Sequence, residues 1–177
     1  GIRDVAVTGV QTCALPISKL LSGFTDSILA YDPFAKTIDG VTLTSLDEVL
    51  KKSDVLSIHL PATAETIGLL NANKLALMKK SAILVNVGRG EVINEIDLES
   101  ALRNQTIAGA ALDVRNQEPP KDKRFTDLEN VILTPHIAGI TKESQAAINR
   151  VLVNEIECAL TGQPQRYAVG SVKQAKP

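Results

Sequence analysis

The chain of 177 residues is poor in aromatic side chains, and it carries almost no net charge. Phe, Trp and Tyr make up 3% of the residues, which leaves few rings for stacking on nucleic-acid bases. A formal net charge of −1 argues against a dedicated nucleic-acid or membrane surface. No run of about 18 apolar residues occurs, so the sequence predicts no transmembrane helix.

Cysteine is also scarce. Cys13 and Cys158 lie far apart and show no metal-ligand spacing, so we expect no metal site. We interpret them as unpaired thiols of a reducing, cytoplasmic compartment. The apolar stretch at residues 5–17 is interrupted by Thr8 and Gln11, and the charges before it cancel, so we expect no secretory signal. Apolar residues still make up 44% of the chain, enough for a sizeable core.

From residue 27 onward, short apolar runs alternate with helical patterns. The expected strands are residues 27–31, 55–60, 82–87, 108–112 and 131–133. Helices are expected after the capping residues Ser45, Asn71 and Asn94, the second of them ending near Lys80. A last helix, about residues 142–160, carries an apolar stripe that we expect to be buried, and Gly162 stops it.

Strands that are apolar on both faces and alternate with helices are typical of a parallel sheet covered on both sides. The sequence therefore predicts an α/β fold with a doubly wound parallel sheet. Ligands of such sheets bind at the carboxyl ends of the strands, so the residues just after each strand are the candidates for chemistry.

Two polar residues follow the first two of these strands. Asp32 comes before Pro33, where a carboxylate can hold the ribose hydroxyls of a dinucleotide and repel a 2′-phosphate. An Asp before a Pro also suits a plain turn. His59 closes the next strand before Pro61, and it is either a structural residue or part of a cofactor wall, with a catalytic role as the further alternative.

The third strand leads into Asn86-Val87-Gly88-Arg89-Gly90. The glycines allow close approach of the backbone to a ligand, and the guanidinium fork of Arg89 suits a carboxylate held by two hydrogen bonds. A solvated turn arginine is the other interpretation. Asp113 and Glu118 follow the fourth strand and His136 the fifth. A cation, a proton donor and a carboxylate to hold the donor therefore meet at one sheet edge.

In this order and spacing, the motifs resemble the D-isomer-specific 2-hydroxyacid dehydrogenases, a family that includes phosphoglycerate dehydrogenase. The resemblance covers about residues 19–162 and implies an NAD-binding domain of the Rossmann type. The segments that carry it are Tyr31-Asp32-Pro33, residues 57–61, residues 86–90, residues 110–114 with Glu118-Pro119, and residues 130–139.

The resemblance implies an enzyme that transfers a hydride between NAD and a 2-hydroxy or 2-keto acid. Arg89 would bind the substrate carboxylate, His136 would be the general acid–base, and Glu118 would hold its imidazole. Asp113 would contact the nicotinamide carboxamide, and Asp32 the adenosine ribose. The chemistry agrees, because an imidazolium can protonate the oxygen of a keto acid as hydride reaches its carbon.

The remaining cofactor contacts implied by the resemblance come from backbone and small residues. Val87, Gly88 and the turn from His136 to Gly139 would line the nicotinamide pocket, with His59 and Pro61 nearby. The resemblance also implies a homodimer formed through the NAD-binding domain. Candidate substrates are phosphoglycerate, glyoxylate and hydroxypyruvate.

The chain departs from the family at its start, where residues 1–18 replace the first strand and the Gly-x-Gly-x-x-Gly turn. We interpret residues 1–18 as a non-native, adapter-derived translation. Val5–Val7 should either pair beside Ile28–Ala30 or pack poorly, and the turn after them should form no phosphate cradle. Residues 163–177 would lead back to a substrate domain, most of which we interpret as missing. We therefore expect this chain alone to bind NAD weakly and to turn over no hydroxy acid.

Two other functions fit the same sequence. One is a non-catalytic, NAD-binding regulatory module of the co-repressor type, because the fold alone does not settle function. The other is a purely structural remnant. The Arg89, Glu118 and His136 set favours catalysis, and a related formate dehydrogenase is disfavoured because Gln is expected in place of His136.

Overall fold

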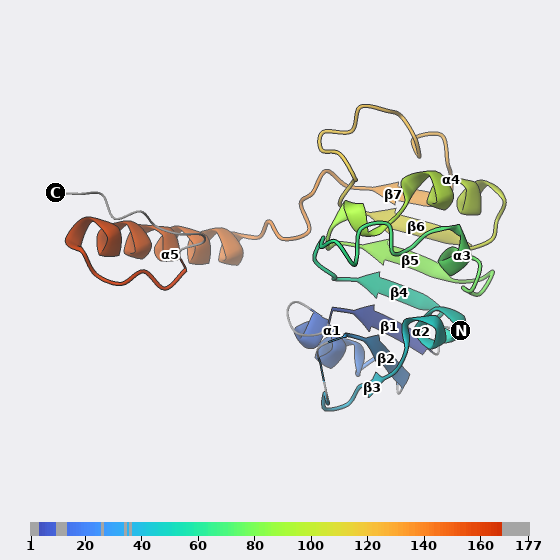
Figure 1. Ribbon diagram of the computed structural model, residues 1–177, viewed down its shortest axis with the longest axis horizontal. Coiled ribbons are helices and arrows are strands. Elements are labelled where there is room, and N and C mark those ends of the chain that lie inside the picture. The colour runs from blue at the N-terminus through green and yellow to red at the C-terminus, as the bar shows by residue number, and fades with distance from the viewer. Residues whose placement is uncertain (1–3, 10–13, 26, 34, 36, 168–177) are drawn as a thin grey trace. The chain divides into compact units, whose positions relative to one another are not determined.

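The computed structural model describes residues 4–9, 14–25, 27–33, 35 and 37–167, in two units, Gly1–His136 and Ile137–Pro177. The first unit contains one parallel sheet of seven strands in the order β3-β2-β1-β4-β5-β6-β7 (Figure 1). The strands are β1 (Asp4–Thr8), β2 (Ser27–Tyr31), β3 (Thr42–Leu43), β4 (Val55–Ile58), β5 (Ile83–Asn86), β6 (Gly109–Leu112) and β7 (Val131–Leu133). The strand order reverses between β1 and β4, so the predicted doubly wound fold is confirmed.

β1 is an interior strand of the sheet and pairs with both β2 and β4. Its register places Val5 beside Ile28 and Val7 beside Ala30, so the first of the two alternatives for this segment is confirmed. Val7 and Ala6 are fully buried, because a short β-branched and small-residue strand fits between two others. Residues 10–13, on which the predicted lack of a phosphate cradle depends, lie outside the described residues.

The helices begin at the predicted capping residues. Ser45 accepts a hydrogen bond from the N–H of Glu48, Asn71 from that of Lys74, and Asn94 from those of Ile96 and Asp97. The helices are α1 (Ala14–Leu21), α2 (Leu46–Lys52), α3 (Ala72–Leu75), the 3-10 helix η1 (Gly90–Val92), α4 (Glu95–Arg103) and α5 (Lys142–Thr161). α3 is shorter than predicted, and it ends at Leu75 instead of near Lys80.

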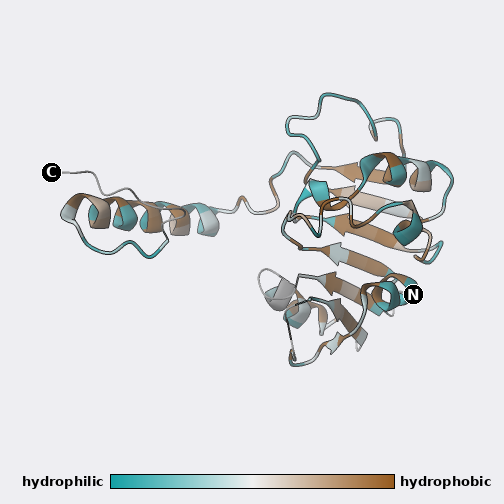
Figure 2. Cartoon of the chain, viewed as in Figure 1, coloured by the Kyte–Doolittle hydropathy of each residue, from teal (hydrophilic) through white to brown (hydrophobic). Residues whose placement is uncertain are grey.

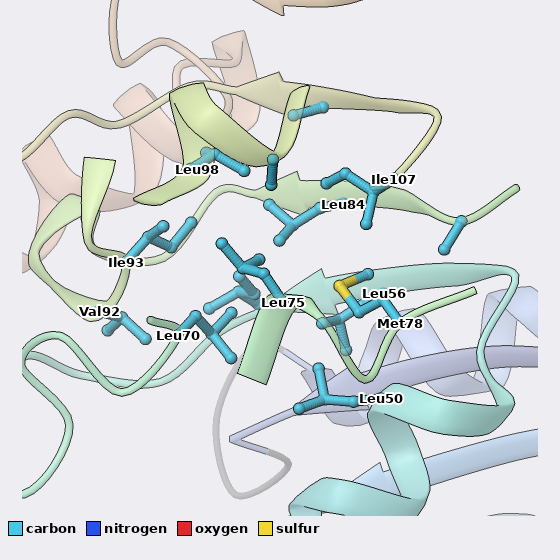
Figure 3. Close-up of a cluster of buried hydrophobic side chains, with 14 of the residues drawn as sticks. Leu50, Leu56, Leu70, Leu75, Met78, Leu84, Val92, Ile93, Leu98 and Ile107 are labelled. Atoms are coloured by element: carbon cyan, nitrogen blue, oxygen red, sulfur yellow. The ribbon is translucent and has the colours of Figure 1, made fainter. Parts of the chain in front are cut away.

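The main core lies on one face of the sheet, beneath α2, α3 and α4 (Figure 3). Leu50, Leu75 and Leu98 of these helices pack with strand residues such as Leu56 and Leu84. These strands are strongly hydrophobic (Figure 2). Burial of each such side chain stabilises the fold by about 1.5–3 kcal/mol.

The opposite face is covered only in part. α1 covers β1 and β2 there, since Ile17 and Leu21 pack on Val7, Ile28 and Ala30. Over β5 and β7 the same face stays open among the described residues of this unit, where Ile83 is 41% and Ile132 68% exposed. The prediction of a sheet covered on both sides therefore holds for only part of the first unit.

The second unit begins at Ile137 and contains α5. Gly162, with φ of 72°, caps the helix in the left-handed conformation, as predicted. The second unit by itself does not bury the predicted apolar stripe, because no residue of α5 is buried and Ile148 and Leu160 are 55% and 83% exposed. A single helix has no second layer within its own unit against which to bury that stripe. No helix among the described residues is long and apolar enough to cross a membrane.

Candidate active site

The buried side chain of Asn86 holds the turn that follows β5. Its amide nitrogen donates to the backbone oxygen of Arg89 at 3.0 Å, and its oxygen accepts from the N–H of Gly88 at 3.1 Å. The sequence predicted no role for Asn86, which was noted only as the first residue of the segment 86–90. The signal that could have identified it is an amide side chain at the end of a buried apolar strand, where it needs local hydrogen-bond partners.

Arg89 lies at the end of this turn with an exposed side chain. Its Nη1 donates to the backbone oxygen of Gly88 at 2.9 Å. Across the described part of the chain, no carboxylate lies within ion-pair distance of its guanidinium. The predicted cation is therefore present at the sheet edge and has donors to offer to an anion.

His136 and Glu118 are brought together as the sequence predicted. The backbone N–H of His136 donates to the carbonyl oxygen of Asp113 at 2.8 Å, which holds the residue against the end of β6. Its Nδ1 lies 2.6 Å from Glu118 Oε2. The other oxygen of Glu118 accepts from the N–H of Arg115 at 2.8 Å.

The charge of Glu118 decides the tautomer of His136. Burial raises the pKa of Glu118, but hydrogen bonds from His136 and from the Arg115 backbone outweigh it, so the pKa lies below its ordinary value. The carboxylate is ionised at neutral pH and can only accept hydrogen bonds. Nδ1 of His136 therefore carries a proton, and Nε2 is the nitrogen that can exchange a proton with a ligand.

A hollow of about 460 Å³ lies beside this pair. Asp113, Glu118, Thr134 and His136 line it together with Pro119. Asp113 is 5% exposed and accepts a hydrogen bond from the Thr134 hydroxyl at 2.5 Å. Three of the predicted residues thus share one hollow, while Arg89 does not line it and follows the neighbouring strand, β5.

A second hollow, of about 420 Å³, lies at the carboxyl ends of β1, β2 and β4. Gly9, Asp32 and Pro61 line it, along with the apolar Leu60 and Leu69. Asp32 Oδ1 also accepts from the N–H of Ala35 at 3.1 Å, so this carboxylate closes a turn as the alternative interpretation expected. The hollow combines an acid with apolar walls.

The imidazole of His59 lines neither hollow. It is 7% exposed, its Nε2 lies 2.8 Å from Ser57 Oγ, and burial lowers its pKa. Its backbone instead supports two glycine turns. A Cβ on Gly9 would lie 2.7 Å from the carbonyl oxygen of His59, and one on Gly88 would lie 3.1 Å from its Cα.

Two predicted cofactor residues, Val87 and Gly139, lie in different units of the structure. Val87 follows β5 within the turn that Asn86 holds. Gly139 belongs to the second unit, where its backbone oxygen accepts from the Ser144 hydroxyl at 2.7 Å.

The chain is similar to one known family of proteins. Residues 3–138 match the family model described as "D-isomer specific 2-hydroxyacid dehydrogenase, NAD binding domain". A D-3-phosphoglycerate dehydrogenase of Archaeoglobus fulgidus is 37% identical in an alignment of length 173 that covers 94% of this chain and 33% of that protein. A glycerate dehydrogenase of Methylorubrum extorquens is 38% identical over 93% of this chain and 54% of that protein.

Solved structures give the same result. A D-lactate dehydrogenase from Treponema pallidum has a TM-score of 0.89 at 31% identity, covering 96% of this chain and 56% of that one. The NAD-complexed D-isomer specific 2-hydroxyacid dehydrogenase from Lactobacillus delbrueckii has a TM-score of 0.87 at 28% identity, covering 95% and 56%. The chain spans between about a third and about half of the relatives it matches. It belongs to the D-isomer specific 2-hydroxyacid dehydrogenases and matches their NAD-binding domain.

Proposed function

We propose that this chain is the cofactor-binding part of an NAD-dependent dehydrogenase that interconverts D-2-hydroxy acids and 2-keto acids. The observation that carries the proposal is the 2.6 Å contact between His136 Nδ1 and Glu118 Oε2, beside a hollow at the carboxyl ends of β6 and β7. This is the edge where parallel α/β sheets bind their ligands. Phosphoglycerate, glycerate and lactate dehydrogenases among the relatives support the substrate class.

The residues at the two hollows fit NAD. Asp32 offers a carboxylate to ribose hydroxyls among the apolar walls of Leu60 and Pro61, and its charge disfavours a 2′-phosphate. Asp113 offers an acceptor to the carboxamide of a nicotinamide at the other end. Gly88 lets the backbone between them pack close to β4, because a Cβ there would lie 3.0 Å from Ile58 O. Bound NADH supplies the hydride.

The chain's own residues then handle charge and protons. In this proposal Arg89 binds the substrate carboxylate, since its guanidinium is exposed at the neighbouring strand end. As the keto carbon gains hydride, its oxygen takes a proton from Nε2 of protonated His136. In the reverse direction the neutral ring accepts that proton at Nε2, because Glu118 keeps the other proton on Nδ1.

The test uses the full-length protein that carries this chain. We expect it to oxidise NADH with one or more of a panel of 2-keto acids that includes glyoxylate and hydroxypyruvate. His136→Asn should lower kcat about 10²–10⁴-fold with NADH affinity kept. The control is Asn104→Ala, which changes an exposed residue at the end of α4 and should leave kcat unchanged.

The competing function is the non-catalytic NAD-binding module. NADH binding without turnover on any keto acid would favour it and refute the proposed enzyme. Near-normal turnover of the His136→Asn variant would instead show that His136 is not the proton donor.

We also propose that the full-length protein is a cytoplasmic homodimer. The exposed apolar side chains of α5, such as Val151 and Ile156, support an interface in a larger assembly. The unpaired Cys158 supports a reducing compartment. Light scattering at several concentrations tests the dimer, and a monomer at all of them would refute it.

A further inference from the structure

The side chain of Arg115 anchors the segment that carries Glu118 to the start of α4. Its Nε donates to Glu95 Oε1 at 2.8 Å and its Nη2 to Glu95 Oε2 at 2.9 Å. The two side chains are 9% and 13% exposed, so this bidentate pair is largely withdrawn from water. Glu95 is the first residue of α4, whose N-terminus favours a negative charge.

Further contacts fix both partners. The guanidinium of Arg115 lies 4.8 Å from the centre of the Phe125 ring, which is 1% exposed. Glu95 Oε1 also accepts from the N–H of Asn116 at 2.8 Å. Burial raises the pKa of Glu95, but the bonds from Arg115 and Asn116 outweigh it, so the pKa stays below its ordinary value and the pair stays charged.

The backbone of Arg115 links this anchor to the proton donor. Its N–H donates to Glu118 Oε1 at 2.8 Å, and Glu118 Oε2 lies 2.6 Å from His136 Nδ1. A continuous set of hydrogen bonds therefore runs from Glu95 through Arg115 and Glu118 to His136. Without the anchor, Arg115 keeps its contact with the Phe125 ring and a 3.3 Å bond to Asp122, whose side chain is 50% exposed, so the N–H that orients Glu118 is held less firmly.

We propose that Glu95 and Arg115 are positioning residues that hold the Glu118 carboxylate and thereby keep the His136 imidazole in its Nδ1–H tautomer. The inference rests on the proposed function, because that tautomer matters for turnover only if His136 moves the proton. Neither residue needs to touch the substrate or cofactor. Both residues act by fixing the orientation of Glu118 and, through it, of the His136 imidazole.

The chain contains a matched ion pair for comparison. Arg103 also forms a bidentate pair, with Asp127 at 2.9 Å and 2.9 Å, but the two side chains are 43% and 61% exposed. It lies on α4, and within the described part of the chain it contacts neither Glu118 nor His136. Its second partner, Glu99, also pairs with Arg124, which lies 3.9 Å from Glu95, so Arg103 reaches the proposed link only indirectly. Arg103→Gln therefore removes an arginine with the same bidentate geometry that touches neither Glu95 nor Arg115.

The experiment is an NMR measurement on this chain labelled with ¹⁵N at histidine. The sequence has only two histidines, so long-range proton–nitrogen correlations report which ring nitrogen of His136 and of His59 is protonated. At a pH where both rings are neutral, we expect wild type and Arg103→Gln to show mainly Nδ1–H at His136. Glu95→Gln and Arg115→Gln should lose most of that preference, with the His59 signals unchanged.

A milder variant keeps the test decisive if either of these fails to fold. Arg115→Lys retains the charge but not the fork, so it should reduce the Nδ1–H population by less than Arg115→Gln does. Wild-type tautomer populations in Arg115→Lys, or in any folded Glu95→Gln or Arg115→Gln protein, would overturn the inference.

Kinetics of the full-length protein separate this inference from the proposed function. Glu95→Gln should lower kcat about 10-fold or more, as loss of an outer partner does for metal-bound histidines, while KM for NADH stays the same. A changed tautomer with no turnover in the wild type would refute the proposed function but not the positioning role. An unchanged tautomer with normal wild-type turnover would refute only the positioning role.

Discussion

Gly90 is the first residue of η1 and directly follows Arg89, and it leaves no space for a side chain. A Cβ built on it would lie 2.1 Å from the carbonyl carbon of Arg115 and 2.5 Å from the nitrogen of Asn116. Ordinary contact for a Cβ begins at 3.4 Å, so Gly90→Ala requires a backbone shift of about 1.3 Å. Both neighbours are backbone atoms, so no side-chain rotation can relieve the clash.

We expect this overpacking to cost about 1–3 kcal/mol of unfolding free energy. For a chain of this size, that lowers the thermal midpoint by about 2–4 °C per kcal/mol. The second effect is on geometry, because the displaced backbone is the one that orients Glu118. A misplacement of about 1 Å can cost about 100-fold in rate, so kcat of the full-length protein should fall by that order.

The assay is thermal unfolding followed by circular dichroism, with NADH oxidation measured on the full-length protein. Gly23→Ala is the matched control, since the nearest atom to its Cβ would be Leu20 O at an ordinary 3.7 Å. It should change stability by no more than about 0.5 kcal/mol. A Gly90→Ala protein with the midpoint and kcat of the control would refute the reasoning.

Three further predictions follow from burial and charge. Leu56→Ala, at a fully buried position, should cost about 2–5 kcal/mol in urea unfolding, whereas Ile132→Ala, at 68% exposure, should cost less than about 0.5. Burial lowers the pKa of His59 in the folded state, so the free energy of unfolding should fall as the pH drops from the ordinary histidine pKa of the unfolded chain toward the lower pKa of the folded state. His59→Gln should remove this pH dependence from the measured unfolding free energy. Asp32→Ser should weaken the preference of this chain for NADH over NADPH by about tenfold, about 1.4 kcal/mol, in calorimetric titrations.

The elements predicted best were those whose evidence is local in sequence. β2 spans the predicted residues 27–31, and the caps at Ser45, Asn71 and Asn94 each accept the expected backbone hydrogen bond. Apolar runs and capping residues act within a few positions, so they can be read without knowing the rest of the fold. The shared edge of the sheet followed from the parallel arrangement alone.

The missed features depend on contacts between distant residues. Arg115 and Glu95 are separated by 20 positions, and no periodic pattern links a residue after a strand to one at the start of a preceding helix. Asn86 resembled any polar residue at a strand end until its two hydrogen bonds to the following turn were seen. The sequence also leaves open what packs on the apolar stripe of α5, because periodicity shows that a face is apolar and not what covers it.

Close packing of backbone segments holds the candidate site in place, and one of these segments also forms the hydrogen bond that orients Glu118. Gly9 and Gly88 both pack against the backbone of His59, so the residues that directly follow β1 and β5 are both held close to the end of β4. Gly90 packs against Arg115, whose N–H orients Glu118. A substitution at Gly90 therefore acts on the same carboxylate as a substitution at Glu95. Variants that combine Gly90→Ala with Glu95→Gln should lose less activity than the product of the single losses, since both disturb one link.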